Sequence, residues 1–450
     1  MKHTYLKYAL FILLIALGSL IFYADSIKLS TFQDQKQLVK AEFFLVWAGI
    51  FSYALMTFNL VLATRFTIIS NFFNGLDKVY FVHKFNGYLI LVFTFLHFVK
   101  SGTLNNQLGV ASKLASDTFS STNKFEGFLQ DEADLAGELV FWLIVSLIIF
   151  SVLKRIGNVQ LLPYGKWKIS HKLFIVVFLT VTFHMLFIKR PFAGGTKIDH
   201  FLVICGTIGC LSLFWTQIRK FFVRKKYQIV EIERLKDTTK IVIEAQTVRY
   251  SRCRPGQFAF ISFRKIPELS EPHPFTIAIC EGGGRKLTFY IKACGDFTKS
   301  IFDKAAFSDE IFVDGPHGNF LPNYTTNASM LWVAGGVGIT PFLSFASSFK
   351  ELEKAPISLL YVVRDQDDLI GLDRLKAAQK TNPNFIYHVV VTSQEGRPSY
   401  DTIASAFPEL RQAVDLYFCG PEALRKSIIK ILKDSGARVN KIKYEVFTFR

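Results

Sequence analysis

Apolar residues are concentrated in the first half of the chain, where they form six long runs. A helix needs about 20 apolar residues to cross the hydrocarbon core of a membrane, and flanking aromatic residues can extend a shorter run. The pattern therefore predicts six membrane-spanning helices, at Tyr8–Tyr23, Phe43–Ala63, Val79–Val99, Leu139–Leu153, Leu173–Ile188 and Phe201–Trp215. No small-x-small cleavage site follows the first run, so we expect a retained helix rather than a secretory signal.

The second half of the chain changes to short alternating segments typical of strands. The first four predict an antiparallel β-barrel, at Tyr227–Ile232, Thr239–Ala245, Gln257–Phe263 and Leu287–Ile291. From about Ser329, strands alternate with helical patterns and predict a doubly wound α/β domain with a parallel sheet. Its strands are expected at Met330–Ala334, Ser358–Val363, Phe385–Thr392 and Asp415–Cys419, with a first helix at Leu343–Phe349. The predicted domains are a bundle of six transmembrane helices (all-α) over 1–222, the barrel over 223–325 and the α/β domain over 326–450.

Charge and cysteine content narrow the possible partners. The net charge is +17, but no nucleic-acid recognition motif accompanies it, so we exclude nucleic acid and expect a lipid bilayer with anionic headgroups. Basic residues beside alternate spans favour cytoplasmic N- and C-termini, and the acidic residues within segment 100–137 suit the outer face. The six cysteines form no CxxC or CxxCH motif, which predicts no covalently attached haem and no disulfide or zinc framework.

Four histidines lie within the predicted spans, His83 and His97 in one and His171 and His184 in another. Ionisable residues inside a membrane are costly and default to a functional interpretation. Imidazole ligates haem iron, so two such helices can hold two stacked b-type haems, each between one histidine from either helix. Spacings of 14 and 13 residues leave the pairs about 40° and about 140° out of phase, so the second helix needs a distortion such as a π-bulge. The alternative is four buried histidines bonded to neighbouring polar groups or lipid headgroups.

Four further motifs lie in the second half. His273-Pro274-Phe275-Thr276 offers an aromatic ring and a hydroxyl to a ligand, and Lys292, Gly295 and Thr298 offer a cation, a bare backbone and a hydroxyl to a pyrophosphate. A proline-bounded strand end and an ordinary Gly-Asp turn are the alternatives. The loop Gly335-Gly336-Val337-Gly338-Ile339-Thr340-Pro341 follows a strand and suits a phosphate at a helix N-terminus, although it is not GxGxxG. Cys419-Gly420-Pro421 ends another strand and permits close approach of a cofactor or another chain segment.

Together, these motifs in this order resemble the NADPH oxidase and ferric reductase superfamily, most closely its bacterial single-chain members. The resemblance runs from about residue 40 to the C-terminus. It implies a six-helix domain with two b-type haems, fused to a ferredoxin-reductase-like module for FAD and for NADPH, or NADH. Electrons are then expected to pass from the nicotinamide to FAD, to the inner haem at His83 and His171, and to the outer haem at His97 and His184.

The resemblance also implies roles for single residues. The flavin is expected at His273, Pro274, Phe275 and Thr276, and its phosphates at Lys292, Gly295 and Thr298. The nicotinamide dinucleotide is expected at Gly335, Gly336, Gly338, Thr340, Pro341, Gly420 and Pro421. Cys419 is expected near the nicotinamide, and Phe449 over the flavin ring, with Phe447 as second choice and a core-filling aromatic as the alternative. Arg364 and Arg397 are the candidates for a ribose 2′-phosphate, because a planar guanidinium binds phosphate bidentately.

The implied activity is that of an NAD(P)H oxidase or a ferric-reductase-type flavocytochrome b, a multi-pass protein of a bacterial inner (cytoplasmic) membrane. The first expected acceptor is O2, which would give superoxide on the outer face. A ferric chelate is the second, and docking to a separate outer-face protein is the third. With no EF-hand loop and no proline-rich tail in the sequence, we expect no obligatory protein activator.

Overall fold

The computed structural model describes residues 2–28, 38–99, 124–152, 155–156, 159–160, 164–188, 195–247, 250, 252–320, 329–349, 356–407, 413–434 and 436–444. It divides into two compact units, Met1–Asn74 with Lys78–Arg219, and Gly75–Asp77 with Lys220–Arg450. Phe447, Phe449 and residues 100–123 of segment 100–137 lie outside the described residues.

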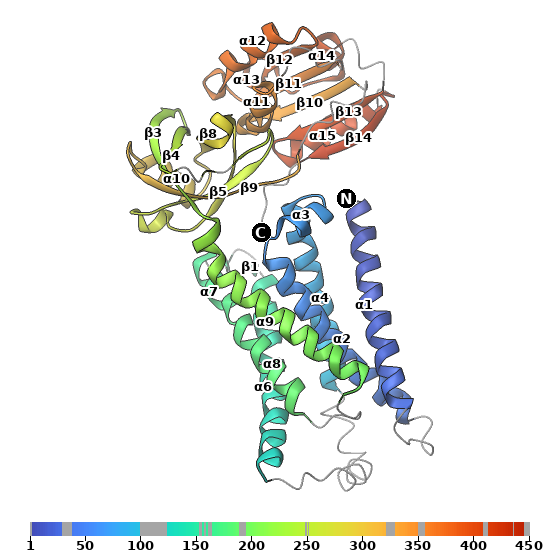
Figure 1. The fold of residues 1–450 in the computed structure, drawn as a ribbon. Helices are drawn as coiled ribbons and strands as arrows, with labels where there is room; N and C mark the ends of the chain where they lie inside the picture. Colours follow the sequence, from blue (N-terminus) through green and yellow to red (C-terminus); the bar gives the residue numbers. More distant parts are fainter. Residues whose placement is uncertain are drawn as a thin grey trace. The chain divides into compact units, whose positions relative to one another are not determined.

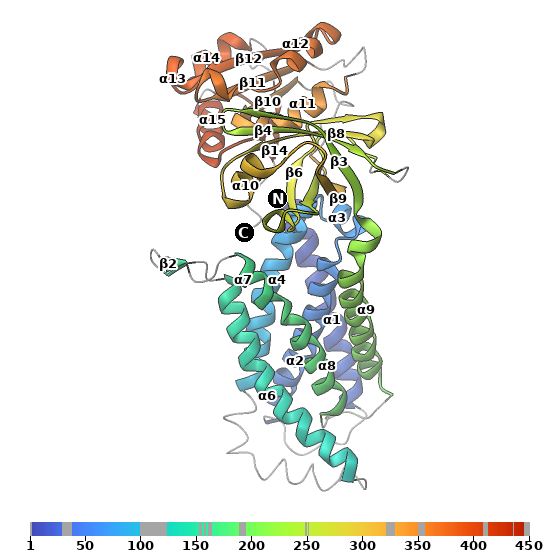
Figure 2. The ribbon, with the colours of Figure 1, turned by 90° about the vertical axis from the view of Figure 1, so that its left-hand side faces the viewer.

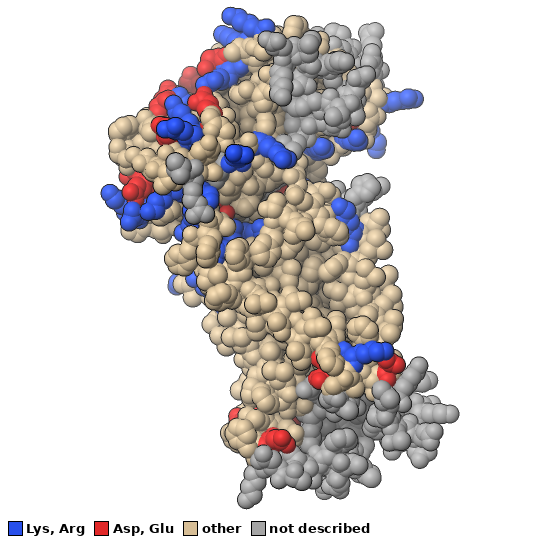
Figure 3. Space-filling model, viewed as in Figure 1, with Lys and Arg blue, Asp and Glu red and all other residues tan. Residues whose placement is uncertain are grey.

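The first unit is a bundle of long apolar helices (Figures 1 and 2). Its elements are α1 (Lys2–Lys28), α2 (Leu38–Ala63), α3 (Thr67–Phe72), α4 (Leu76–Val99), α6 (Lys124–Val152), β1 (Arg155–Ile156), β2 (Val159–Gln160), α7 (Tyr164–Lys172), α8 (Phe174–Phe187) and α9 (Lys197–Val223). Among the described residues, six spans are long and apolar enough to cross a membrane, α7 and α8 counting as one. Figure 3 shows a wide band over this bundle without Lys, Arg, Asp or Glu, as expected for a surface that faces lipid. The six predicted spans are confirmed.

The acid-rich segment before the fourth span differs from expectation. The sequence places the start of that span at Leu139, whereas α6 begins at Lys124. Glu126, Asp131, Glu132 and Asp134 therefore lie on the first turns of a continuous helix. Glu126 lies in the first turn, where the positive end of the helix dipole stabilises a negative side chain, and Asp131, Glu132 and Asp134 are exposed. A polar stretch can therefore continue the apolar helix.

Polar side chains inside the bundle pair across helices. Tyr8 of α1 donates to Asn86 of α4 at 3.3 Å, and the Asn86 amide donates to the Leu55 carbonyl at 2.9 Å. Tyr53 of α2 and Thr182 of α8 share a hydrogen bond of 3.0 Å. Because hydrocarbon offers no alternative partner, such pairs fix the register of the helices that they join.

The fifth span is broken between its two histidines. α7 ends at Lys172 and α8 begins at Phe174, and the Leu173 amide donates to the Ser170 carbonyl at 3.0 Å, a tightened i→i−3 bond. The sequence calls for a distortion here because a straight helix would leave His171 and His184 about 140° apart. A distortion is present, but it is a break with a 3₁₀-type bond, so the suggested π-bulge is wrong in kind.

The second unit begins with a curled antiparallel sheet in the strand order β6-β5-β9-β3-β4-β8-β7. Its elements are β3 (Lys225–Leu235), β4 (Thr238–Ala245), β5 (Phe258–Phe263), β6 (His273–Thr276), β7 (Ile279–Glu281), β8 (Lys286–Lys292), α10 (Asp296–Lys304) and β9 (Glu310–His317), with 3₁₀ turns η2 (Pro267–Leu269) and η3 (Gly282–Gly284). The segment after β6 connects the β6 edge of this sheet with the β7 edge. In it, the Ile277 amide donates to the Gln257 carbonyl and the Ala278 amide donates to the Thr288 carbonyl. Alternate residues of these strands fill one apolar core, which includes Tyr227, Ile243, Ile261 and Phe289.

A five-stranded parallel sheet follows, in the order β12-β11-β10-β13-β14. Its elements are β10 (Ser329–Gly335), η4 (Gly336–Ile339), α11 (Thr340–Ala346), β11 (Ile357–Val363), η5 (Gln366–Asp368), α12 (Leu372–Thr381), β12 (Phe385–Val391), α13 (Thr392–Glu395), α14 (Tyr400–Ala406), β13 (Val414–Cys419), α15 (Glu422–Asp434) and β14 (Val439–Tyr444). Separate apolar clusters cover its two faces. The predicted doubly wound sheet is confirmed, with α11 beginning three residues before the expected Leu343. The strand order reverses between β10 and β13, where such sheets bind ligands.

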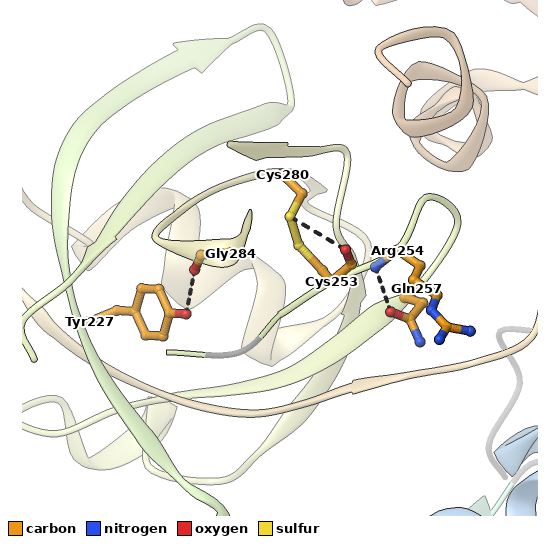
Figure 4. Close-up of a disulfide and its surroundings, with 6 residues drawn as sticks. All are labelled: Tyr227, Cys253, Arg254, Gln257, Cys280 and Gly284. Carbon is orange, nitrogen blue, oxygen red and sulfur yellow. Dashed lines mark hydrogen bonds between the residues drawn. A yellow bond between two sulfur atoms is a disulfide. The ribbon is translucent and has the colours of Figure 1, made fainter. Parts of the chain in front are cut away.

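A disulfide joins Cys253 to Cys280 in the barrel, so the expectation of no disulfide is wrong (Figure 4). Cys253 lies in the loop before β5 and Cys280 in β7, and 27 residues separate them. The spacing of the cysteines along the chain did not reveal this disulfide, because the two cysteines belong to no recognisable motif. In the same loop, Gln257 accepts from the Arg254 amide at 2.7 Å, and a side chain at Gly256 would overlap the Phe320 carbonyl. The disulfide therefore ties a closely packed loop to the barrel.

We expect Cys280→Ser to lower the stability of the oxidised protein by about 3 kcal/mol, because the disulfide closes a loop of this length. The measurement is the melting transition of the full-length protein in detergent, without reductant. Cys294→Ser is the matched control, since Cys294 is an exposed free thiol. Equal melting of both variants and the unmodified chain would contradict the expectation.

Candidate functional site

The structure brings the four histidines together in two pairs. The rings of His83 on α4 and His171 on α7 have centroids 6.2 Å apart, and those of His97 on α4 and His184 on α8 are 6.5 Å apart. A metal–imidazole bond is about 2 Å long, and a ring nitrogen lies about 1 Å from the ring centre, so two imidazoles on opposite sides of one metal ion have centroids about 6 Å apart. Both separations fit an iron held between two histidines.

Hydrogen bonds at Nδ1 determine the tautomer of three of these rings. Nδ1 lies 3.2 Å from the Asn59 carbonyl in His83, 2.9 Å from the Leu45 carbonyl in His97 and 2.7 Å from the Ala133 carbonyl in His184. A carbonyl only accepts, so Nδ1 carries the proton and Nε2 keeps the lone pair that binds a metal. His171 differs, because its Nδ1 lies 3.2 Å from the Ser151 hydroxyl, which can donate or accept. Sequence spacing gave no signal for any of these partners.

A stacked aromatic pair occupies the level between the two histidine pairs. Tyr53 lies on α2 between Gly49, which abuts His97, and Asn59, which bonds to His83. Its ring stacks on Phe178 of α8 with centroids 5.5 Å apart and planes inclined by 8°. Both side chains are buried, so apolar packing separates the two pairs.

The expected flavin residues lie on β6 at one edge of the barrel sheet. The His273 ring stacks on Phe297, with centroids 3.7 Å apart, and Phe275 lies nearly parallel to Phe297 at 6.3 Å. Pro274 is half-buried, and Thr276 is buried at the end of β6, the strand that pairs with β5. Phe297, which the sequence did not single out, thus joins the predicted motif to the start of α10. A planar ring system is the ligand that such a group of nearly parallel rings favours.

The expected phosphate residues lie at the turn between β8 and α10. The Thr298 hydroxyl accepts from the Cys294 and Gly295 amides at 2.9 and 3.0 Å, and a side chain at Gly295 would meet nothing within 4 Å. Lys292 instead points into an ion cluster, 3.0 Å from Asp237 and 3.9 Å from Asp368. The Thr298 hydroxyl thus takes the Cys294 and Gly295 amides, and the bare backbone at Gly295 leaves room for an anion beside the N-terminus of α10. The ammonium of Lys292 already has two carboxylate neighbours.

That ion cluster links the barrel to the α/β domain and was not foreseen. Lys236, in the turn between β3 and β4, lies 2.9 Å from Asp365 and 3.1 Å from Asp368, next to η5. The hydrogen bond from Lys236 holds the pKa of Asp365 below its usual value. Burial acts to raise the pKa of Asp368, but the bonds from Lys236 and the Asp365 amide keep it low as well. Both carboxylates therefore stay charged, and they join the two domains next to Lys292.

The glycine-rich loop and the Cys419 turn meet at backbone distance at the switch point of the parallel sheet. A side chain at Gly338 would overlap the Cys419 carbonyl, and one at Gly335 would lie 2.7 Å from Pro421. Gly336 has φ +55 and open space around it, and Gly420 has φ +155. Thr340 and Pro341 begin α11, so the loop leads directly into a helix N-terminus. This arrangement leaves backbone amides next to an open surface where a pyrophosphate can bind.

The remaining candidates occupy distinct places. Cys419 is fully buried at the end of β13 and packs in an apolar cluster. Arg364 ends β11, Arg397 precedes α14 beyond the end of β12, and both are exposed. These two strands are adjacent and parallel, so both guanidinium groups belong to the edge of the sheet where ligands bind. Phe449 and Phe447 lie outside the described residues.

Three family models match the chain in succession. They are the ferric reductase like transmembrane component over residues 48–182, an FAD-binding domain over 223–321 and an oxidoreductase NAD-binding domain over 332–430. His83, His97 and His171 fall within the first model, and His184 lies just after its end. The nucleotide-binding candidates from His273 to Pro421 fall within the other two.

Curated relatives match the second half. The electron transfer component of toluate 1,2-dioxygenase from Pseudomonas putida is 24% identical over 49% of this chain and 66% of its own length. The flavohemoprotein of Rhizobium meliloti is 26% identical over 52% of this chain and 61% of its own length. The chain thus spans about two thirds or less of these relatives. A solved ferredoxin-NADP⁺ reductase from Plasmodium falciparum aligns with 49% of this chain and 96% of its own, at 20% identity and a TM-score of 0.40.

The order of the three domain models decides the classification, because the membrane component precedes both nucleotide-binding domains on one polypeptide. Six apolar spans accompany the first model, and an antiparallel and a parallel sheet accompany the other two. The chain is therefore a multi-pass membrane protein and an NAD(P)H-dependent oxidoreductase, with the domain architecture of the NADPH oxidase and ferric reductase superfamily.

Proposed function

We propose that this protein carries electrons from NADPH through FAD and two b-type haems across a bacterial cytoplasmic membrane to O2, producing superoxide on the outer face. The observation that carries the proposal is the pair of imidazole separations, 6.2 and 6.5 Å, in the apolar interior of the bundle. Bound FAD accepts two electrons as a hydride and releases them singly, and the haems carry single electrons. The chain's own residues bind and orient these groups.

The four histidines would hold the two haems, His83 with His171 and His97 with His184. With Nδ1 of His97 and His184 donating to carbonyls, their Nε2 atoms are left available to an outer iron. A haem held by two histidines would carry single electrons and would offer no open position to a substrate, so the acceptor is expected to take its electron without ligating the metal. O2 suits this demand because it is small, soluble in hydrocarbon and takes one electron at a time.

Both nucleotides are assigned to the second unit. Thr276 and the rings of His273 and Phe275 orient the flavin, and the turn at Gly295 with the N-terminus of α10 holds its phosphates. The loop from Gly335 to Pro341 holds the NADPH pyrophosphate, with Cys419 and Gly420 beside the nicotinamide. Arg364 and Arg397 bind the 2′-phosphate. In the first unit, the ends of α4 and α7 with His83 and His171 are proposed to face the cytoplasm, since Arg65, Lys78, Lys166 and Lys168 lie near them.

The direct test is NADPH-driven reduction of cytochrome c by the haem-loaded, full-length protein in detergent with FAD. We expect superoxide dismutase to remove most of the signal, because the electron reaches cytochrome c through superoxide. Reduction of cytochrome c or of a ferric chelate that dismutase leaves unchanged would overturn O2 as the acceptor and indicate direct metal reduction.

We expect His97→Leu and His184→Leu each to reduce the haem content from about two to about one per chain and to abolish acceptor reduction, because an axial ligand of the outer iron is lost. Reduction of FAD by NADPH should remain. Haem is measured as the pyridine haemochrome in membranes. His200→Leu is the matched control, since His200 is exposed on α9 and bonds to its own helix at Thr196. Two haems in both outer variants would refute the ligand assignment.

We expect Arg364→Ala to raise the KM for NADPH about tenfold and to leave the KM for NADH unchanged, because a charge-assisted bond to the 2′-phosphate contributes about 1.5–3 kcal/mol. Steady-state kinetics with both nucleotides measures the ratio. Lys376→Ala on α12 removes an exposed cation elsewhere on the domain and should change neither constant. An equal change for NADPH and NADH would show that Arg364 does not contact the 2′-phosphate.

A further inference from the structure

Both histidines of the outer pair contact a neighbouring helix in the same way. His97 of α4 bonds to the Leu45 carbonyl of α2, and a side chain added at Gly49 would lie 2.7 Å from its Nδ1. His184 of α8 bonds to the Ala133 carbonyl of α6, and a side chain added at Gly137 would lie 2.6 Å from its ring. In each case, a glycine stands four residues after the residue whose carbonyl accepts the bond.

The geometry of an α-helix explains this spacing. The carbonyl of residue i accepts from the amide of residue i+4, and the Cβ of residue i+4 tilts back toward the helix N-terminus. The side chain at i+4 therefore covers the outer side of that carbonyl. A glycine uncovers it, and the second lone pair of the oxygen can accept from an imidazole that lies against the bare backbone.

The inner pair lacks this arrangement. His83 bonds to the Asn59 carbonyl, and the residue four positions later is Ala63, the last residue of α2. That bond is the longest of the three to carbonyls, at 3.2 Å. His171 bonds to the Ser151 side chain instead of a carbonyl. The two sites thus differ in how firmly the backbone holds their ligands.

Other glycines of the spans show that the contact is specific. A side chain at Gly18 of α1 or Gly87 of α4 would meet nothing within 4 Å. A side chain at Gly209 of α9 would overlap the Phe178 ring, so this glycine serves helix packing and contacts no histidine. Among the described glycines of the spans, only Gly49 and Gly137 have a histidine ring as the nearest group.

We propose that Gly49 and Gly137 are positioning residues for the outer haem. They uncover the Leu45 and Ala133 carbonyls, which hold the Nδ1 protons of His97 and His184 and so keep Nε2 available to the iron. This inference rests on the proposed function, in which a haem lies between those two histidines. In this proposal, the backbone that these two glycines uncover on α2 and α6 serves the outer haem site and not the inner one.

The test is Gly137→Ala and, independently on another helix, Gly49→Ala, studied in membranes of the full-length protein. We expect each variant to lose the outer haem, with the content falling from about two to about one per chain, or to keep it with a changed low-spin EPR signal and a shifted potential. The inner haem should keep its own EPR signal and redox step, which shows that the bundle is folded.

Gly87→Ala and Gly18→Ala are the matched controls. Each adds the same methyl group to a membrane-spanning helix where it meets nothing within 4 Å, Gly87 on the helix of His97 and Gly18 on α1. If either control alters the outer haem as much as Gly137→Ala, or if Gly49→Ala and Gly137→Ala leave both haem signals and potentials unchanged, the positioning role is overturned. A protein that binds fewer than two haems before any substitution would instead refute the proposed function on which this inference rests.

Discussion

An imidazole inside a hydrocarbon layer must find a hydrogen-bond partner, and the arrangement of the six-helix unit follows from this constraint. His83, His97 and His184 each use a main-chain carbonyl of an adjacent helix, although that carbonyl belongs to a helix that is already hydrogen-bonded. Each such bond brings α2 or α6 close to a histidine helix. The same hydrogen bonds therefore hold the helices together and determine which ring nitrogen of each histidine carries the proton.

The second unit depends on close backbone contact instead of paired side chains. Gly338 meets Cys419 where the order of the parallel strands reverses, and Gly256 meets Phe320 where the barrel joins the α/β domain. The cluster of Lys236, Asp365 and Asp368 adds charge to the same junction. The Gly256 contact and the ion cluster join the barrel to the α/β domain, whereas the Gly338 contact lies within the α/β domain. An extended dinucleotide would span the junction between the two domains.

The sequence was sufficient for elements whose periodicity is strong. Long apolar runs predicted the six spans, and short apolar runs that alternate with helical patterns predicted β10, β11, β12 and β13. Other strands escaped because their patterns are weak: β14 reads Val-Asn-Lys-Ile-Lys-Tyr and lies at a sheet edge, and β9 contains Gly315-Pro316. The disulfide and the carbonyl partners of the histidines escaped for another reason, since each joins residues distant in the chain. Spacing within one helix predicted that a distortion was needed at the fifth span, but only the folded chain shows its kind.

The break at Leu173 has a consequence for how the two histidine levels are spaced. In α4, a continuous helix fixes the rise between His83 and His97, because every intervening peptide is hydrogen-bonded to the next turn. In the opposite span, the interruption between α7 and α8 lets His171 take an orientation that is not dictated by His184. The continuous helix α4 thus fixes the distance between His83 and His97, and the broken fifth span can adjust the position of His171 to match. Substitutions that straighten the fifth span would tilt one ring out of its pair while leaving the opposite helix unchanged.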